Sequence, residues 1–138
     1  KLPFKQAVDR ILREAISADR DLPPYNRVMM DGVTLSSKAW MEGVRKFEVE
    51  GIQLPGQPPL ILNDPNHCIK TMTGAVLPTG CNLVVPREEF EQKDNQITVD
   101  AGYNAEIGRY LHKQGSDCSK GDELIKKGFL WFWLVLIC

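Results

Sequence analysis

The sequence lacks the residue patterns that mark several common classes of protein. Its four cysteines are widely spaced and form no CxxC pair. This spacing argues against a zinc ribbon or a secreted disulfide scaffold, and favours reduced thiols in a cytoplasmic protein. There is no long run of one charge sign, and 17 Lys+Arg against 18 Asp+Glu give a net charge of −1. Because such a surface does not attract a polyanion, we expect no nucleic-acid binding.

Common catalytic and membrane signatures are missing as well. There is no GxSxG nucleophile elbow and no GxxxxGK[ST] phosphate loop, and the only histidines are His67 and His112. The start carries no charged stretch followed by an apolar run, so no secretory signal is predicted. The longest apolar run, Phe129 to Cys138, has ten residues. A transmembrane helix needs about 20, so we expect no membrane anchor.

What is present is the composition of one globular domain. The chain has 138 residues, of which 43% are hydrophobic and 25% charged. These values allow a buried core and exclude a disordered chain. The length is short for a complete enzyme that catalyses several steps.

The first segment favours a helix. Apolar residues recur there at helical spacing: Ala7, Val8, Ile11, Leu12, Ala15 and Ile16. Pro3 suits a first turn, and the charged residues Arg10, Arg13 and Glu14 fall on the other side. The sequence therefore predicts one amphipathic N-terminal helix of roughly three turns.

The rest of the chain favours β structure. Short apolar or alternating segments at 47–50, 58–62, 82–85 and 96–99 are separated by Gly, Pro, Asn and Asp. No strand–helix–strand rhythm accompanies them, which predicts a mainly β (α+β) fold. The segment after Gly108 reads as a loop and then a β turn into a returning strand. This order predicts a small second lobe, residues 1–20 and 120–138, with an irregular β domain, residues 21–119, inserted into it.

Three glycine-containing stretches could carry chemistry: MMDG at 29–32, KTMTG at 70–74 and QGSD at 114–117. Asp31 and Asp117 offer the hard oxygens that Mg²⁺ prefers, and Thr73 can hydrogen-bond a phosphate or a metal-bound water. The same residues also suit plain turn chemistry, with Asp31 bonding nearby amides and Gly32 accommodating a positive φ. The residues alone leave both interpretations open.

The order of three longer stretches is more specific. DLPPYNRVMMDG, CIKTMTGAVLPTGCNLVVPREEFE and GRYLHKQGSDCSKGDEL occur in this order. They resemble the N-terminal half of the molybdopterin molybdenumtransferases, the MoeA and gephyrin E-domain family. The resemblance runs from about Gln6 to Gly128, and MDG followed by MTGAxLPxG is its most specific part.

The resemblance implies a function. Such proteins ligate molybdate to molybdopterin, taking the pterin as its adenylylated form and hydrolysing the adenylate with a divalent metal. The resemblance also implies an elongated homodimer, with a pocket shared between the β domain of one subunit and an α/β domain of the other. The implied catalytic residues are Asp31, Thr73 and Asp117, and the implied cofactor-binding residues are Lys70, Gly74 and Lys113. The two aspartates are the implied magnesium ligands.

The sequence also departs from the family's pattern. His112, Lys113 and Gln114 replace the family's arginines, and Ser116 replaces its glutamate, which reduces the fixed positive charge available to an anion. The resemblance ends near Gly128, and an α/β domain is missing. We therefore expect a truncated or frameshifted N-terminal fragment of a molybdenum cofactor biosynthesis protein, with an incomplete site. The alternative is a non-catalytic dimerisation or partner-binding module of the same family.

Overall fold

A computed structural model describes residue 3 and residues 6–130 of the chain. The chain forms two compact units, which we describe separately. The terminal unit consists of Lys1–Leu22 and Gly115–Cys138, and the β unit of Pro23–Gln114. Residues 131–138, which hold most of the apolar run, lie outside the described residues.

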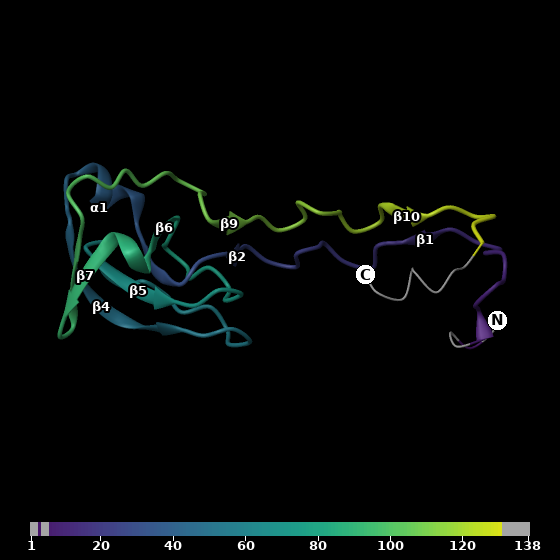
Figure 1. The fold of residues 1–138 in the computed structure, drawn as a ribbon, viewed down its shortest axis with the longest axis horizontal. Coiled ribbons are helices and arrows are strands. Elements are labelled where there is room, and N and C mark those ends of the chain that lie inside the picture. The colour runs from purple at the N-terminus through teal and green to yellow at the C-terminus, as the bar shows by residue number, and fades with distance from the viewer. Residues whose placement is uncertain (1–2, 4–5, 131–138) are drawn as a thin grey trace. The chain divides into compact units, whose positions relative to one another are not determined.

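A six-stranded sheet forms the body of the β unit (Figure 1). Its strands follow the order β6-β3-β5-β4-β8-β7, and every neighbouring pair is antiparallel except β4 and β5. The strands are β3 Gly32–Leu35, β4 Lys46–Gln53, β5 His67–Thr71, β6 Leu83–Pro86, β7 Phe90–Lys93 and β8 Gln96–Val99. Buried and exposed residues alternate strictly along β8, as expected for a strand with one face on a core.

The core of the β unit lies between this sheet and one short helix. Helix α1, Ser37–Met41, follows β3, and the Ser36 hydroxyl caps it by accepting a hydrogen bond from the Lys38 amide. The core cluster consists of Val33, Leu35, Ala39, Trp40, Phe47, Cys68, Leu83, Val85, Phe90, Ile97 and Val99. A 3₁₀ turn, η2 Arg87–Glu89, links β6 to β7. The core thus draws on every strand of the sheet and on the helix.

A second, two-stranded sheet in the β unit pairs β2, Arg27–Val28, with β9, Leu111–His112. The other edge of β2 bonds the segment that follows β5. The Val28 amide donates to the Ala75 carbonyl at 2.9 Å, and the Gly74 amide donates to the Val28 carbonyl at 2.8 Å. Strand β2 therefore connects β9 to the loop that carries the MTG motif.

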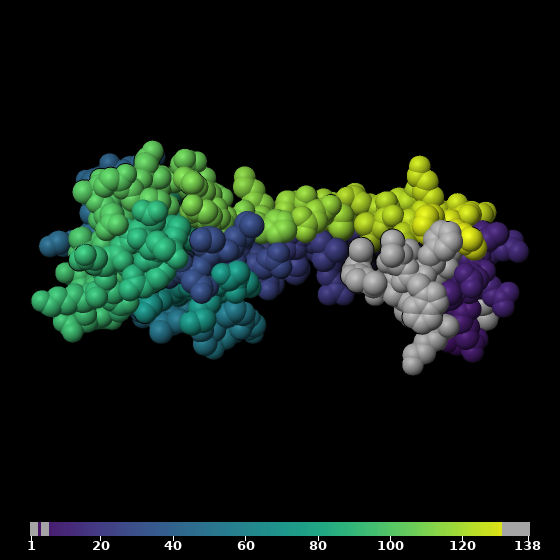
Figure 2. Space-filling view, viewed as in Figure 1, coloured from purple at the N-terminus to yellow at the C-terminus, as the bar shows by residue number. Residues whose placement is uncertain are grey.

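In the terminal unit, the two ends of the chain run antiparallel. Strand β1, Ile16–Ser17, pairs with β10, Glu123–Ile125. An isolated bridge joins Ile11 to Leu130. In Figure 2 the purple N-terminal residues and the yellow C-terminal residues of this unit lie against each other. Strand β10 is the returning strand that the sequence predicts.

The predicted N-terminal helix is wrong. Residues 6–20 contain no α-helix; Asp9 has a φ of 60°, and Ile11 is 61% exposed. An amphipathic helix derives most of its stability from burying its apolar face. In the described part of the terminal unit only one apolar residue, Ala18, is buried. The described residues of this unit thus offer no buried cluster to receive a helix, and Ile16–Ser17 pair with the returning chain instead.

The other predictions of secondary structure fare better. The mainly β fold class is confirmed, with α1 as the one α-helix among the described residues. The predicted strands at 47–50, 82–85 and 96–99 correspond to β4, β6 and β8. Segment 58–62 forms no named strand, and only Ile61 makes an isolated bridge, to Thr79. No helix among the described residues is long and apolar enough to cross a membrane.

Candidate functional site

Asp31 and Thr73 meet directly in the β unit. Asp31 lies immediately before β3, and Thr73 lies two residues beyond the end of β5. These strands are antiparallel neighbours, with Gly32 opposite Thr71. The Thr73 amide donates a hydrogen bond of 2.7 Å to Asp31 Oδ1, and the Thr73 hydroxyl donates one of 2.8 Å to the same oxygen. Two motifs 42 residues apart therefore form one exposed polar pair.

Local backbone geometry places this pair. Gly74 adopts a φ of +90° in a tight turn, in which the Ala75 amide donates to the Met72 carbonyl at 3.0 Å. This turn aims the Thr73 amide and hydroxyl in the same direction, and a residue with a side chain would be strained at position 74. On the other side, the Arg87 amide donates to the Asp31 carbonyl at 2.9 Å. Backbone hydrogen bonds therefore hold the chain on both sides of the pair.

Gly32 has a different role from the one the sequence suggests. The expectation of a positive φ is wrong, because Gly32 is an ordinary strand residue at the start of β3. A Cβ atom at this position would collide with the carbonyl oxygen of Val85 on β6. Glycine is needed here because β3 and β6 approach closely beside Asp31.

The hydrogen bonds set the charge of the site. The Thr73 amide, and next the Thr73 hydroxyl, lower the pKa of Asp31 below its ordinary value by bonding the ionised carboxylate. Asp31 is therefore an anion at neutral pH. Two methionine side chains, Met29 at 51% exposure and Met72 at 49%, belong to the same two motifs. The exposed anion is thus flanked in sequence by exposed apolar groups.

Each of the other predicted site residues has contacts of its own. The Lys70 amine donates to Gln92 Oε1 at 3.0 Å. Lys113 is exposed just after β9. Asp117 belongs to the terminal unit, where its amide donates to the Leu22 carbonyl at 2.9 Å. Among the predicted site residues of the β unit, the structure brings together Asp31, Thr73 and the neighbouring Gly74.

The described residues do not form a metal site on their own. Among residues 3 and 6–130, no group of three or more His, Cys, Asp or Glu side chains is arranged to hold a metal ion. The adjacent residues His67 and Cys68 therefore belong to no metal-binding group among the described residues. The imidazole of His67 lies 3.0 Å from Glu50, and Cys68 is buried. Burial raises the pKa of Cys68 to about 12 and that of Cys81 to about 11, so both thiols stay protonated and unreactive.

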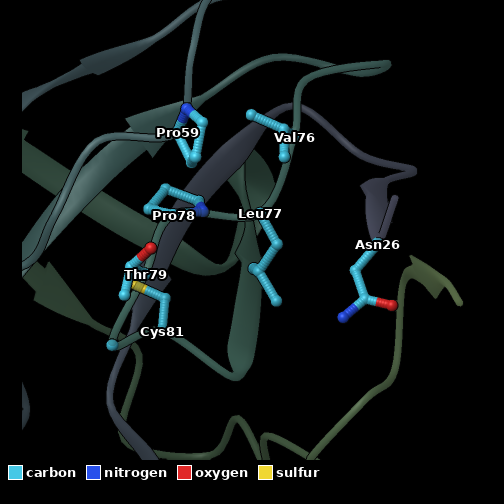
Figure 3. A pocket seen from close by; sticks show the side chains of 8 residues that line it. Asn26, Pro59, Val76, Leu77, Pro78, Thr79 and Cys81 are labelled. Atoms are coloured by element: carbon cyan, nitrogen blue, oxygen red, sulfur yellow. The ribbon is translucent and has the colours of Figure 1, made fainter. Parts of the chain in front are cut away.

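A pocket of about 300 Å³ is lined by the residues that follow the MTG turn in the sequence (Figure 3). It is lined by Asn26, Pro59 and residues 76–81. The Leu77 amide donates to the Asn26 carbonyl at 2.9 Å, which ties the segment after the MTG turn to the segment before β2. The LPTG stretch therefore forms a wall of this pocket.

Comparison with known proteins identifies the family. A family model described as the MoeA N-terminal region (domain I and II) matches residues 1–130. The chain belongs to this family. Molybdopterin molybdenumtransferase from Synechocystis sp. is 42% identical over 117 residues, which cover 85% of this chain and 30% of that protein. The enzyme of the same name from Synechococcus elongatus is 32% identical over 133 residues, covering 93% of this chain and 32% of that protein.

A solved structure agrees with the family assignment. The molybdopterin biosynthesis MoeA protein from Pyrococcus horikosii matches with a TM-score of 0.85 at 26% identity. The match covers 96% of this chain and 34% of that one. The chain thus spans about a third of the length of the relatives it matches.

Sequence reasoning missed one basic residue of this MoeA N-terminal region. In the β2–β9 pair, Arg27 lies opposite His112, and its Nη2 is 3.0 Å from His112 Nδ1. Arginine can only donate, so the imidazole nitrogen accepts. Strand β2 therefore brings a fixed cation beside His112, where the family resemblance leads one to expect arginine. No sequence pattern links the two residues, because they are 85 positions apart.

Proposed function

We propose that this chain takes part in inserting molybdate into adenylylated molybdopterin, as the N-terminal region of a MoeA-type protein. The observation that carries the proposal is the Asp31–Thr73 pair, in which two hydrogen bonds from Thr73 hold one carboxylate oxygen. The pair joins the MDG and MTG motifs, and the Synechocystis and Synechococcus relatives are named for this transfer. The second oxygen, Oδ2, has no hydrogen-bond partner among the described residues.

The charge state of Asp31 indicates what it does. A carboxylate with a lowered pKa is a weak base, so it is poorly suited to storing a proton during the reaction. It remains negative, and it can orient a water molecule or bind a cation through Oδ2. Thr73 is its positioning residue. We therefore assign Asp31 an electrostatic and orienting role at the adenylate, with Thr73 fixing its direction.

The described residues do not form a complete site for magnesium. Mg²⁺ in phosphate chemistry is commonly held by one or two carboxylates together with substrate phosphates and waters. Asp31 supplies one carboxylate in the β unit, and the contribution expected from Asp117 stays a prediction. We assign no reaction step to the metal. The cofactor-binding roles of Lys70, Gly74 and Lys113 and the cytoplasmic location also stay predictions.

A chimera tests the proposal. Residues 1–130 would replace the matching region of the Synechocystis enzyme, which supplies the remaining two thirds or so of the protein. We expect the chimera to form molybdenum cofactor from molybdate and adenylylated molybdopterin. Replacing Asp31 with Asn should lower the rate at least tenfold, because the amide has no charge, while Lys93→Gln on β7 should leave the rate unchanged. A fully active Asp31→Asn chimera would show that the carboxylate is not required.

The alternative function is that of a dimerisation or partner-binding module without catalysis. Exposed apolar side chains on the β unit, such as Met41 and Ile107, favour it. Under this alternative the chimera would be inactive even though it folds. Sedimentation of the purified chain over a range of concentrations tests the homodimer that the resemblance implies, and a monomer at all concentrations would contradict it.

A further inference from the structure

The β unit has a second groove, and none of its lining residues belongs to the MDG or MTG motif. It has a volume of about 330 Å³, and it is bordered by residues of α1, Arg45, Asn104, Ala105 and Ile107. Trp40 and Leu83 form its apolar part. Met41 and Ile107 also line it, and they are 75% and 61% exposed. Exposed large apolar side chains gathered around one depression are typical of a surface that binds a partner or a ligand.

The guanidinium of Arg45 is fixed in the wall of the groove. Its Cζ lies 3.7 Å from the centroid of the Trp40 ring. Its Nη1 donates to the carbonyl oxygens of Trp40 at 2.9 Å and Val44 at 2.8 Å. The first bond reaches a carbonyl in the last turn of α1, as a basic residue near a helix C-terminus commonly does, and the second reaches the loop that follows the helix. They hold the side chain in one orientation.

The two hydrogen bonds to carbonyl oxygens use only the Nη1 group of this guanidinium. Its Nε–H and Nη2–H groups make no hydrogen bond to any described residue, and no described carboxylate lies within ion-pair distance of it. The acidic residue Glu106 lies between groove residues in the sequence, but its carboxylate pairs with Arg109 at 3.5 Å and not with Arg45. Arg45 is half-buried, and no described carboxylate neutralises its charge. Its unbonded edge has the geometry that binds a carboxylate through two parallel hydrogen bonds.

We propose that this groove docks a peptide segment of a partner protein in which a carboxylate stands next to a large apolar side chain. The carboxylate binds the Nε–Nη2 edge of Arg45, and the apolar side chain packs beside Trp40 between Met41 and Ile107. The volume is at the lower end of the range for ligand pockets, which suits one or two side chains better than a whole cofactor. This interaction is additional to molybdate transfer and does not depend on it.

Peptide titration followed by NMR tests the proposal on the complete 138-residue chain. The probe is the peptide acetyl-Gly-Glu-Leu-Phe-Gly-amide, and the matched control has Lys in place of Glu. We expect amide shifts confined to residues 37–45, 83 and 104–107, with binding of the Lys peptide weaker by about tenfold or more. Equal binding of both peptides would show that Arg45 does not select a carboxylate. Absence of shifts in the groove at millimolar peptide would overturn the docking site itself.

Variants that change the charge separate binding from folding. Met41→Glu places a negative charge at an exposed position that the fold does not need, and should weaken binding of the Glu peptide about tenfold by repulsion. Lys93→Gln on β7 lowers the net charge by the same one unit, at a residue that does not line the groove, and should leave binding unchanged. If both variants lost binding equally, the loss would come from the net charge of the protein, and the groove would not be the binding site. A third variant, Arg45→Gln, should lose the preference for Glu over Lys while retaining native circular dichroism.

Discussion

At the scale of single residues, the short contact between Asp31 and Thr73 has a measurable electrostatic effect. Thr73→Val removes the hydroxyl donor and keeps the backbone amide, so the pKa of Asp31 should rise part of the way toward its ordinary value of 3.8. Thr73→Ser keeps a hydroxyl and should change it less. The carboxyl ¹³C shift of Asp31, followed against pH, measures both variants. An unchanged pKa in Thr73→Val would mean that the hydroxyl does not bond the ionised form.

The same contact contributes to stability in a defined pH range. The folded pKa lies below the unfolded one, so the contribution is present above 3.8 and is lost as pH falls through the folded value. The difference in unfolding free energy between the wild type and Thr73→Val should therefore be largest above that range and shrink in stronger acid. Urea unfolding at several pH values measures it.

At the scale of elements, the close approach of β3 and β6 depends on one missing side chain. Gly32→Ala would drive a methyl group into the Val85 carbonyl and against Pro86, both of which are backbone atoms that cannot rotate away. We expect a loss of about 2 kcal/mol or more in unfolding free energy. Gly102→Ala is the matched control, since a Cβ there meets nothing within 4 Å, and its effect should stay within about 0.5 kcal/mol. Equal stability of the two variants would mean that the strands can separate without cost.

The loop after β4 depends on a buried side-chain amide. Gln53 is 0% exposed; its Nε2 lies within hydrogen-bond distance of the carbonyls of Leu54, Gln57 and Pro58, and its Oε1 accepts from the Leu60 amide at 2.7 Å. In a proline-rich loop these bonds replace the missing backbone ladder. Gln53→Leu should therefore cost about 3 kcal/mol, because it leaves buried polar groups unpaired.

Thermal and urea unfolding measure this cost, with Gln57→Leu as the control in the same loop. Gln57 is exposed, and only its backbone carbonyl bonds Gln53. Its replacement should change the unfolding free energy by less than about 0.5 kcal/mol. If Gln53→Leu were equally mild, the loop would have to be held by its other contacts, such as the bond from the Thr79 amide to the Leu60 carbonyl.

The sequence predicts those elements whose pattern is local. The alternation over 96–99 predicts β8 with the same bounds, because one face of that strand meets the core. The helical spacing between Ala7 and Ile16 is as clear, yet it fails, because the pattern does not reveal whether a core exists to receive it. Gln53 was missed for a related reason: its polar side chain is buried by a loop that the sequence shows only as turn material.

The candidate site was only partly predictable. Asp31 and Thr73 could be selected from their motifs, but their contact depends on the pairing of β3 with β5. The pairing of Arg27 with His112 likewise depends on strand register across most of the β unit. Register is fixed by the whole sheet, and a local window of sequence does not contain it.

At the scale of the whole molecule, the two units differ in how much apolar surface they bury. All residues of the core cluster belong to the β unit, whereas Ala18 is the one buried apolar residue in the described part of the terminal unit. Hydrogen exchange should therefore be slowest in β3, β5 and β8 and faster, by about tenfold or more, in β1 and β10. Exchange of individual amides, followed by NMR, measures this. Equal protection of the two units would mean that the chain unfolds as one cooperative body.

The pairing of β1 with β10 has a consequence for synthesis of the protein. Ile16 and its partner Ile125 are separated by the entire β unit, so the ribosome must translate that unit before β1 can find its partner. Until then β1 lacks its partner strand, while the six-stranded sheet can already assemble. Chains that end at residue 114, held on the ribosome by an added C-terminal linker long enough to clear the exit tunnel, should therefore show a protease-resistant sheet and cleavage within residues 6–22.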